Sequence, residues 1–377
     1  MSSSSATGLD YVPTYVLKAM GETGFEYIAQ MFTRISQGEI LIPEDWRRGR
    51  ITLIPKSNSD KRVLSTYRPI TISTVLYRLF AKILCREVQT WMEQSGILGE
   101  MQYGFRKERR GEDCIFILTS AIEIARQEGT GLITCFLDCT RAYDRIDRNI
   151  LWRVLEEKEM PKPILELIKL LYTENEVTLK LGEHSSKTMG PSTGLRQGCP
   201  LSPVLFIIFI SDLEKRLEQT GAGFKVRLRG NIFDFREKKH LNISGLLFAD
   251  DLALISHSRE GMEKLLRVVS DFGEEMNLLF NPEKSAIVEF AECADSERAF
   301  LVQNRTLPVM DSYKYLGVTL SNGNNYLEEQ EKIWEARAEK VLRQMHARSL
   351  WRFNRFEITK IQWKSTAVPA STYANSV

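Results

Sequence analysis

Three aspartates occupy positions where a carboxylate is unfavourable unless something compensates its charge. Asp138 follows an apolar, β-prone run over residues 132–137, and the pair Asp250-Asp251 lies between two apolar segments. Two like charges 4 Å apart repel by roughly 4 kcal/mol at an effective dielectric of about 20. Mg²⁺ offsets such repulsion, because it binds carboxylate oxygens together with substrate phosphates and water. A turn that exposes Asp250-Asp251 to water is the alternative interpretation.

The metal-site interpretation requires the strands that carry these aspartates to be neighbours in one sheet. Two cations held roughly 3.5–4 Å apart can activate an attacking oxygen and hold a departing pyrophosphate. Asp138 with Asp250 and Asp251 supplies enough carboxylates for this chemistry. The neighbouring position of the strands is an inference, since the sequence does not contain it.

The elements that must position these aspartates are predicted from apolar periodicity. Helical spacing predicts helices over residues 9–38, 74–96, 114–127, 148–158, 163–174, 202–218, 258–276 and 328–348. β-prone runs predict strands over residues 50–55, 132–137, 242–256 (two strands), 286–290 and 315–320, and a hairpin over 176–191 around Gly182. A turn is expected at residues 57–60. Strands and helices do not alternate regularly, which favours an α+β fold over a doubly wound sheet.

Positive charge is concentrated in one segment of the chain. Residues 47–110 contain 14 Lys and Arg against 5 Asp and Glu, although the net charge of the whole chain is only +2. A basic segment of this kind displaces counterions from phosphates, which favours nucleic acid of any sequence. An ordinary solvated surface is the alternative. The overall composition, 43% hydrophobic and 27% charged, is that of an ordinary globular protein.

Cysteines and apolar runs indicate an intracellular protein. The six cysteines, Cys293 among them, form no CxxC pair, and with the four histidines they give no zinc spacing. Free thiols fit the reducing cytoplasm or nucleus. Residues 1–8 are Ser-rich and lack the apolar core of a secretory signal, and the longest apolar run, 204–210, is too short to span a bilayer. We therefore expect no secretion and no transmembrane segment.

Eight short motifs follow one another between about residue 46 and residue 320. They are Ile51-Thr-Leu-Ile-Pro-Lys56, Tyr67-Arg-Pro-Ile-Thr-Ile-Ser73, Gln102-Tyr-Gly-Phe-Arg106, Phe136-Leu-Asp138 through Ala142-Tyr-Asp144, Gly194-Leu-Arg-Gln-Gly-Cys-Pro-Leu-Ser-Pro203, Phe248-Ala-Asp-Asp251, Asn281-Pro-Glu-Lys-Ser285 and Tyr315-Leu-Gly-Val318. In this order they resemble the reverse transcriptases of non-LTR (LINE-type) retrotransposons. The resemblance implies a right-hand polymerase fold, with fingers, a palm whose antiparallel sheet packs on helices, and a truncated helical thumb.

The resemblance also implies a catalytic role for four side chains. Asp138, Asp250 and Asp251 would bind two Mg²⁺ ions, with Mn²⁺ as a substitute, and the backbone carbonyl of Cys139 is a candidate additional ligand. Lys284 would donate a proton to the departing pyrophosphate. A solvated surface lysine is the alternative for Lys284.

Nucleotide-binding roles are implied for five further residues. Lys56 and Arg68 would contact the triphosphate of the incoming nucleotide, where cations offset developing charge; ordinary basic surface is the alternative. Gln197 and Gly198 would line the nucleotide pocket, the glycine permitting close approach of the backbone. The ring of Tyr143 would be the steric gate that excludes a ribose 2′-hydroxyl, and a plain core aromatic is its alternative.

Nucleic-acid contacts are implied for a basic cluster and one turn. Arg106, Lys107, Arg109 and Arg110 would bind template or primer phosphates, which gives affinity without reading sequence. Gly317 would belong to the primer grip, a hairpin that positions the primer end.

The predicted function is therefore RNA-directed DNA polymerase, a nucleotidyltransferase that adds dNTPs to a DNA primer 3′-hydroxyl on an RNA template. A catalytically inactive retroelement remnant that binds RNA is the main alternative. An RNA-copying RNA polymerase or intron maturase, which Tyr143 disfavours, and a structural α+β domain are the others. We expect residues 1–38 to form a leader, 39–320 the reverse transcriptase domain and 321–377 a partial thumb. Because the motifs of an endonuclease and a zinc knuckle are not visible, we interpret the chain as a fragment or truncated copy.

Overall fold

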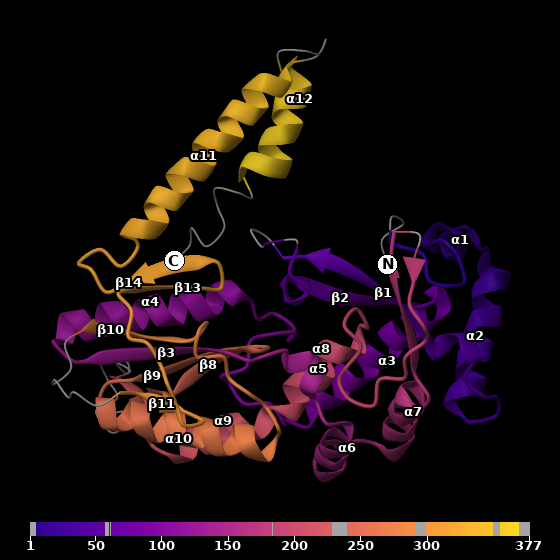
Figure 1. Ribbon diagram of the computed structural model, residues 1–377, viewed down its shortest axis with the longest axis horizontal. Coiled ribbons are helices and arrows are strands. Elements are labelled where there is room, and N and C mark those ends of the chain that lie inside the picture. Colours follow the sequence, from indigo (N-terminus) through magenta and orange to yellow (C-terminus); the bar gives the residue numbers. More distant parts are fainter. Residues whose placement is uncertain are drawn as a thin grey trace, which may run out of the picture. The chain divides into compact units, whose positions relative to one another are not determined.

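A computed structural model of the 377-residue chain shows a mixture of helices and short sheets (Figure 1). It describes residues 5–56, 60, 62–182, 184–227, 240–291, 299–349 and 355–368. Most of the turn predicted at residues 57–60, and Cys293, lie outside these residues. The chain forms two compact units: Met1–Gly99 with Arg141–Asp212 and Glu275–Leu278, and Glu100–Thr140 with Leu213–Glu274 and Leu279–Val377. The predicted domain boundaries stay a prediction.

The first unit begins with two helices, where the sequence predicted one. Helix α1 spans Thr14–Ala19 and α2 spans Glu22–Ser36. Met20 and Gly21 between them have extended backbones, so the helical hydrogen bonds stop and a new helix begins. Phe32 of α2 is buried against the ring of Phe80 at a centroid distance of 5.0 Å. Only Phe32 and Ile35 of α2 are buried.

A four-stranded sheet of the first unit has the order β2-β1-β4-β5. Strand β1 (Arg48–Pro55) pairs antiparallel with β2 (Tyr67–Ile72) and parallel with β4 (Glu176–Leu181). The short strand β5 (His184–Ser185) turns back on β4 after Gly182, whose φ of 60° suits glycine. The hairpin predicted around Gly182 is therefore confirmed.

Five further helices of the first unit include one, α8, that is almost entirely apolar. They are α3 (Val75–Gln94), α5 (Ala142–Arg145), α6 (Arg148–Glu157), α7 (Lys162–Tyr172) and α8 (Leu201–Phe209). Helix α8 is buried along nearly its whole length and packs on α3 and α6. The single helix predicted over residues 202–218 is wrong, because the backbone breaks at Ile210 before α9 (Ser211–Gln219) begins. An apolar helix suits the core, whereas the charged sequence of α9 requires a solvated face.

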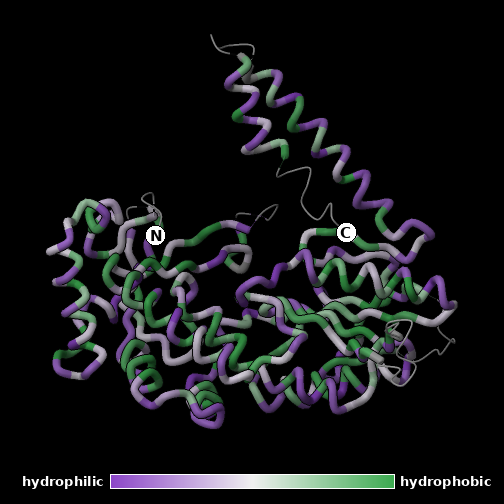
Figure 2. Tube along the Cα trace, turned by 180° about the vertical axis from the view of Figure 1, so that it is seen from behind, coloured by the Kyte–Doolittle hydropathy of each residue, from purple (hydrophilic) through white to green (hydrophobic). Residues whose placement is uncertain are grey.

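The central sheet of the second unit is antiparallel and has the order β10-β3-β9-β8. Its strands are β3 (Leu132–Asp138), β8 (Gly245–Phe248), β9 (Asp251–Ser256) and β10 (Ala286–Ala291). Helix α4 (Gly111–Glu128) packs on one face and α10 (Arg259–Glu275) lies along the other (Figure 1). The strands are mainly hydrophobic (Figure 2), as a sheet covered on both faces requires. The predicted strand that ends at Asp138 is confirmed.

Three short hairpins and two helices complete the second unit. The hairpins are β6 (Phe224–Arg227) with β7 (His240–Ile243), β11 (Leu301–Val302) with β12 (Arg305–Thr306), and β13 (Ser312–Tyr315) with β14 (Val318–Ser321). The strand predicted over residues 315–320 is interrupted by a turn, since β13 ends at Tyr315, Leu316 and Gly317 have positive φ, and β14 begins at Val318. Helix α11 (Glu328–Ser349) packs on β14, and α12 (Arg355–Gln362) follows. In the described part of the chain no helix is both long and apolar enough to cross a membrane.

Candidate active site

Strand pairing in the second unit brings two of the predicted aspartates together. In the antiparallel register of β3 and β9, Asp138 stands directly opposite Asp251. Opposed residues of an antiparallel pair project their side chains on the same face of the sheet. Asp250 occupies the β8–β9 turn beside them, where Ala249 has a φ of 58°. Three carboxylates from two adjacent strand ends therefore share one edge of the sheet.

A turn over residues 281–285 joins this edge through the backbone of Asp138. The Asp138 N–H donates to Ser285 Oγ at 3.1 Å, and the Asn281 N–H donates to the Asp138 carbonyl at 2.9 Å. Ser285 Oγ in turn donates to the Asn281 carbonyl at 2.7 Å. Lys284 Nζ consequently lies 3.8 Å from Asp138 Oδ2. The sequence predicted Lys284 at the site, whereas Ser285, which ties the turn to Asp138, was missed.

The turn between β8 and β9 is held by Gln102, to which the sequence analysis assigned no role of its own. Its buried side-chain oxygen accepts hydrogen bonds from the N–H of Ala249 at 3.1 Å and of Gly104 at 2.8 Å. Gly104 lies so close that a Cβ there would stand 2.4 Å from the Ala249 nitrogen. Gln102 thereby fixes the left-handed conformation that presents Asp250. Gln102 is the first residue of the Gln102-Tyr-Gly-Phe-Arg106 motif, but its hydrogen bond to Ala249 depends on tertiary structure that the motif does not reveal.

In the first unit, the predicted nucleotide-pocket residues form a frame of their own. Gln197 Nε2 donates to Asp144 Oδ1 at 2.7 Å, and the Thr71 N–H donates to the Gln197 carbonyl at 2.7 Å. Gly198 has a φ of 104°, and a Cβ there would stand 2.7 Å from the Thr71 carbonyl oxygen. These contacts connect the loop at 197–198 to strand β2 and to helix α5, which carries Tyr143 and Asp144.

Comparison with known proteins assigns the family. A family model described as reverse transcriptase (RNA-dependent DNA polymerase) matches residues 54–320, well over half of the chain. The chain belongs to the reverse transcriptase family. This match includes the aspartate pair register, the 281–285 turn and the Gln197 frame. The resemblance predicted from the eight motifs is confirmed.

Individual relatives come from non-LTR retrotransposons. The reverse transcriptase is 28% identical over 301 residues to the Pol polyprotein of the R2 element of Nasonia vitripennis, covering 77% of this chain and 27% of the relative. It is 21% identical over 345 residues to the RNA-directed DNA polymerase of the jockey element of Drosophila melanogaster, covering 90% of this chain and 36% of that one. The chain thus spans about a third of the length of these relatives.

A solved structure supports the predicted fold. Telomerase of Candida tropicalis, determined with a fragment of telomeric RNA, superimposes with a TM-score of 0.51 at 12% identity, covering 94% of this chain and 59% of that chain. At this identity the likeness shows the fold alone. The right-hand polymerase fold predicted for the reverse transcriptase is confirmed.

Electrostatics at the aspartate edge suits a divalent cation. Burial, then the neighbouring Asp250 and Asp138, raise the pKa of Asp251 to about 6. Burial is the main cause and the neighbouring carboxylates add to it, and a bound cation would oppose the repulsion among them. Reverse transcriptases generally use divalent metal ions. Among the described residues no three His, Cys, Asp or Glu side chains are grouped so that they could hold a metal ion by themselves. Mg²⁺ also takes water and substrate phosphates as ligands, so it would need fewer carboxylates from the chain.

Tyr313 is a further residue at this edge that sequence analysis missed. Its ring stacks on Phe136 of β3 at a centroid distance of 4.5 Å, and its hydroxyl donates to the Lys284 carbonyl at 2.7 Å. Burial, followed by the charges of Asp138 and Asp251, raises its pKa to about 12. The period-2 spacing from Tyr315, which lies in the Tyr315-Leu-Gly-Val318 motif, was the signal that could have identified it.

The remaining predicted residues lie on surfaces of their own unit. In the second unit Lys107 is exposed, whereas Arg109 contacts Glu100 Oε2 at 2.5 Å and lies over the Tyr103 ring at 5.1 Å. Arg106 donates to the Gln102 carbonyl at 3.4 Å, and the Arg110 N–H donates to Asp113 at the start of α4. Gly317 has a φ of 91° in the β13–β14 turn. In the first unit Lys56 and Arg68 are exposed at β1 and β2.

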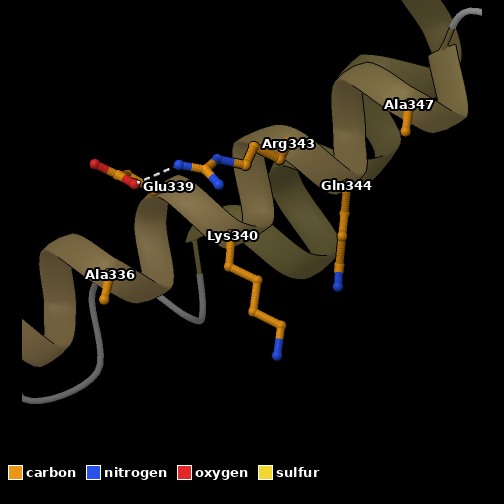
Figure 3. Close-up of a pocket in the computed structure, with 6 residues that line it drawn as sticks. All are labelled: Ala336, Glu339, Lys340, Arg343, Gln344 and Ala347. Atoms are coloured by element: carbon orange, nitrogen blue, oxygen red, sulfur yellow. Dashed lines mark hydrogen bonds and ion pairs between the residues drawn. The ribbon is translucent and has the colours of Figure 1, made fainter.

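An open hollow along α11 contains none of the predicted site residues. It is lined by one face of the helix: Ala336, Glu339, Lys340, Arg343, Gln344 and Ala347. Figure 3 shows Lys340 and Gln344 extending from this face, while Glu339 pairs with Arg343 at 3.0 Å. This hollow therefore lies apart in sequence from every predicted site residue.

Asp251→Asn is expected to stabilise the fold at neutral pH when metal is absent. The raised pKa means that the folded state binds this proton more tightly, so Asp251 destabilises the fold increasingly from about pH 4 to pH 6 and fully above that. Because the Asp251 side chain is partly desolvated but still in contact with water, which screens its charge, we expect a gain of only about 1 kcal/mol. Thermal melts in EDTA measure it. The gain should disappear near pH 4, and a variant less stable than the wild type at pH 7.5 would contradict the repulsion.

Proposed function

We propose that this chain is the catalytic core of an RNA-directed DNA polymerase that extends a DNA primer on an RNA template. The observation that carries the proposal is the pairing of Asp138 with Asp251 beside Asp250. These carboxylates would hold two Mg²⁺ ions, which lower the pKa of the primer 3′-hydroxyl and neutralise the departing pyrophosphate. Mn²⁺ has the same preference for oxygen ligands and is expected to substitute.

The reaction forms a bond between the primer 3′-oxygen and the α-phosphorus and breaks the bond from that phosphorus to the β-phosphate oxygen. The three carboxylates would orient the reacting groups, and no covalent intermediate would form on the chain. Lys284, held near Asp138 by the 281–285 turn, would donate the proton that the leaving pyrophosphate takes up. Tyr313 holds the backbone of Lys284 in place through its hydroxyl. Positioning and charge stabilisation then account for the rate enhancement.

Nucleotide selection is assigned to the first unit. Gln197 and Gly198 would line the pocket, and Tyr143 would exclude the 2′-hydroxyl of a ribonucleotide. Lys56 and Arg68, exposed at the ends of β1 and β2, would contact the triphosphate. Their charge offsets that of the transferring phosphates.

Nucleic-acid binding is assigned to surfaces of the second unit. Arg106, Lys107, Arg109 and Arg110 would bind template or primer phosphates, and the turn at Gly317 would position the primer end. Lys107 has 87% of its side chain exposed and is accessible for this phosphate contact. RNA template, DNA primer and dNTPs are the proposed partners.

Removal of divalent cations is expected to abolish the proposed activity reversibly. With poly(rA) primed by oligo(dT), the wild-type chain should incorporate dTTP in Mg²⁺ and fall to background in EDTA, because the ions supply several kcal/mol of transition-state stabilisation. Excess Mg²⁺ should restore incorporation. Retained binding of the primed template without incorporation in Mg²⁺ or Mn²⁺ would instead support an RNA-binding remnant.

A further inference from the structure

The ring of Tyr143 rests on a second aromatic ring from the core. Tyr143 and Phe206 stack with centroids 4.9 Å apart and an interplanar angle of 26°. Phe206 lies on α8 and is only 1% exposed. A fully buried ring on an apolar helix cannot retreat without displacing close-packed neighbours. Phe206 therefore forms a rigid surface directly behind Tyr143.

The backbone of Tyr143 is fixed at the same time. Its carbonyl accepts the Leu195 N–H at 2.8 Å, and the next turn is held by Gly194 N–H donating to the Ile146 carbonyl at 2.8 Å. Arg148 Nε donates to the Gly194 carbonyl at 2.9 Å. Helix α5 has only four residues, so these contacts rather than the helix itself set its position. The Tyr143 ring is then free to move only about its own side-chain torsions.

We infer that Phe206 determines sugar specificity by preventing the Tyr143 ring from yielding to a ribose 2′-hydroxyl. The inference rests on the proposed function, in which Tyr143 excludes ribonucleotides. A ribonucleotide is excluded only if displacing the Tyr143 ring is unfavourable. The stacked Phe206 ring makes that displacement unfavourable. Phe206 touches no nucleotide in this account; it is a positioning residue for Tyr143.

Phe206→Leu is expected to relax discrimination between dATP and ATP. On poly(rU) primed by oligo(dA) these substrates differ only in the 2′-hydroxyl. Loss of the stacking contact should lower the ratio of their kcat/KM values about three- to tenfold, through a lower KM for ATP. Phe209→Leu is the matched control, because Phe209 lies on the same helix and is equally buried. It should destabilise the fold comparably and leave the ratio unchanged.

Further variants separate this inference from the proposed function. Tyr143→Ala should relax the ratio more than Phe206→Leu. If the leucine variant does not fold, Phe206→Met also removes the flat ring and replaces it with a flexible side chain that adapts to the core. If Tyr143→Ala lowers the dATP-to-ATP ratio but Phe206→Leu and Phe206→Met leave it unchanged, the role of Phe206 is refuted while the proposed function stands. Equal relaxation by Phe209→Leu would also overturn it, and so would an unchanged ratio in Tyr143→Ala.

A binding measurement covers the case of an inactive chain. Dissociation constants for dATP and ATP on a dideoxy-terminated primer report sugar selectivity without catalysis. A wild-type chain that prefers dATP there but does not extend a normal primer would refute the proposed activity. In that case Phe206→Leu still tests the role of Phe206. A weaker binding preference for dATP over ATP supports that role, and an unchanged preference refutes it.

Discussion

Asp251→Asn is expected to lower the rate of dNTP incorporation by at least about a thousandfold. The substitution removes one negative charge from the pair that β3 and β9 place directly opposite each other. Cations that bind the 3′-oxygen and the pyrophosphate stabilise the transition state by several kcal/mol. Each 1.4 kcal/mol lost lowers the rate by a factor of about ten. Single-nucleotide extension at saturating dNTP, over a range of Mg²⁺ concentrations, measures the loss.

A control aspartate distinguishes this loss from a general effect of charge. Asp271 is exposed on α10 in the same unit, so Asp271→Asn should extend the primer at the wild-type rate. The increased stability expected for Asp251→Asn in EDTA excludes unfolding as the reason for inactivity. Activity of Asp251→Asn within tenfold of the wild type at saturating Mg²⁺ would refute the assignment of this carboxylate to the metal site.

Much of the fold was predictable because each element carries a local signal. The apolar run of β3 is closed by Asp138, and the predicted helix over 114–127 corresponds to α4, which ends at Gly129 with a φ of 62°. Such signals depend on residues close in sequence. The sequence analysis predicted one helix across each of the breaks at Gly21 and Ile210. Apolar spacing continues through both breaks, so periodicity alone does not locate them.

The candidate site likewise contains residues that the sequence reveals and residues that only the tertiary structure reveals. The aspartates were visible because three carboxylates at the ends of apolar strands are unusual in themselves. Their supports were not visible, because each depends on tertiary pairing. Gln102 reaches Ala249 only because its segment lies beside β8, where the Tyr103 N–H donates to the Leu247 carbonyl at 2.8 Å. Phe206 is one of several buried residues of α8, and only its stacking on Tyr143 distinguishes it.

Gly104→Ala is expected to damage both stability and catalysis, although residue 104 contains no reactive group. Its Cβ would stand 2.4 Å from the nitrogen of Ala249 and 3.0 Å from the carbonyl carbon of Phe248. Both are backbone atoms, so relief requires a shift of the turn that presents Asp250. Overpacking of this kind costs about 1–3 kcal/mol. Displacement of a catalytic group by about 1 Å can lower the rate about a hundredfold.

Gly111→Ala provides the matched comparison for this prediction. The added Cβ at Gly111 would meet its nearest neighbour, Leu316 Cδ1, at 3.6 Å, which is ordinary contact, and the residue begins α4. We expect this variant to match the wild type in activity and to be as stable or more stable by up to about 1 kcal/mol. Urea unfolding and single-turnover extension measure both variants. If Gly104→Ala behaves like Gly111→Ala, the close approach of segment 102–104 does not position Asp250 for catalysis.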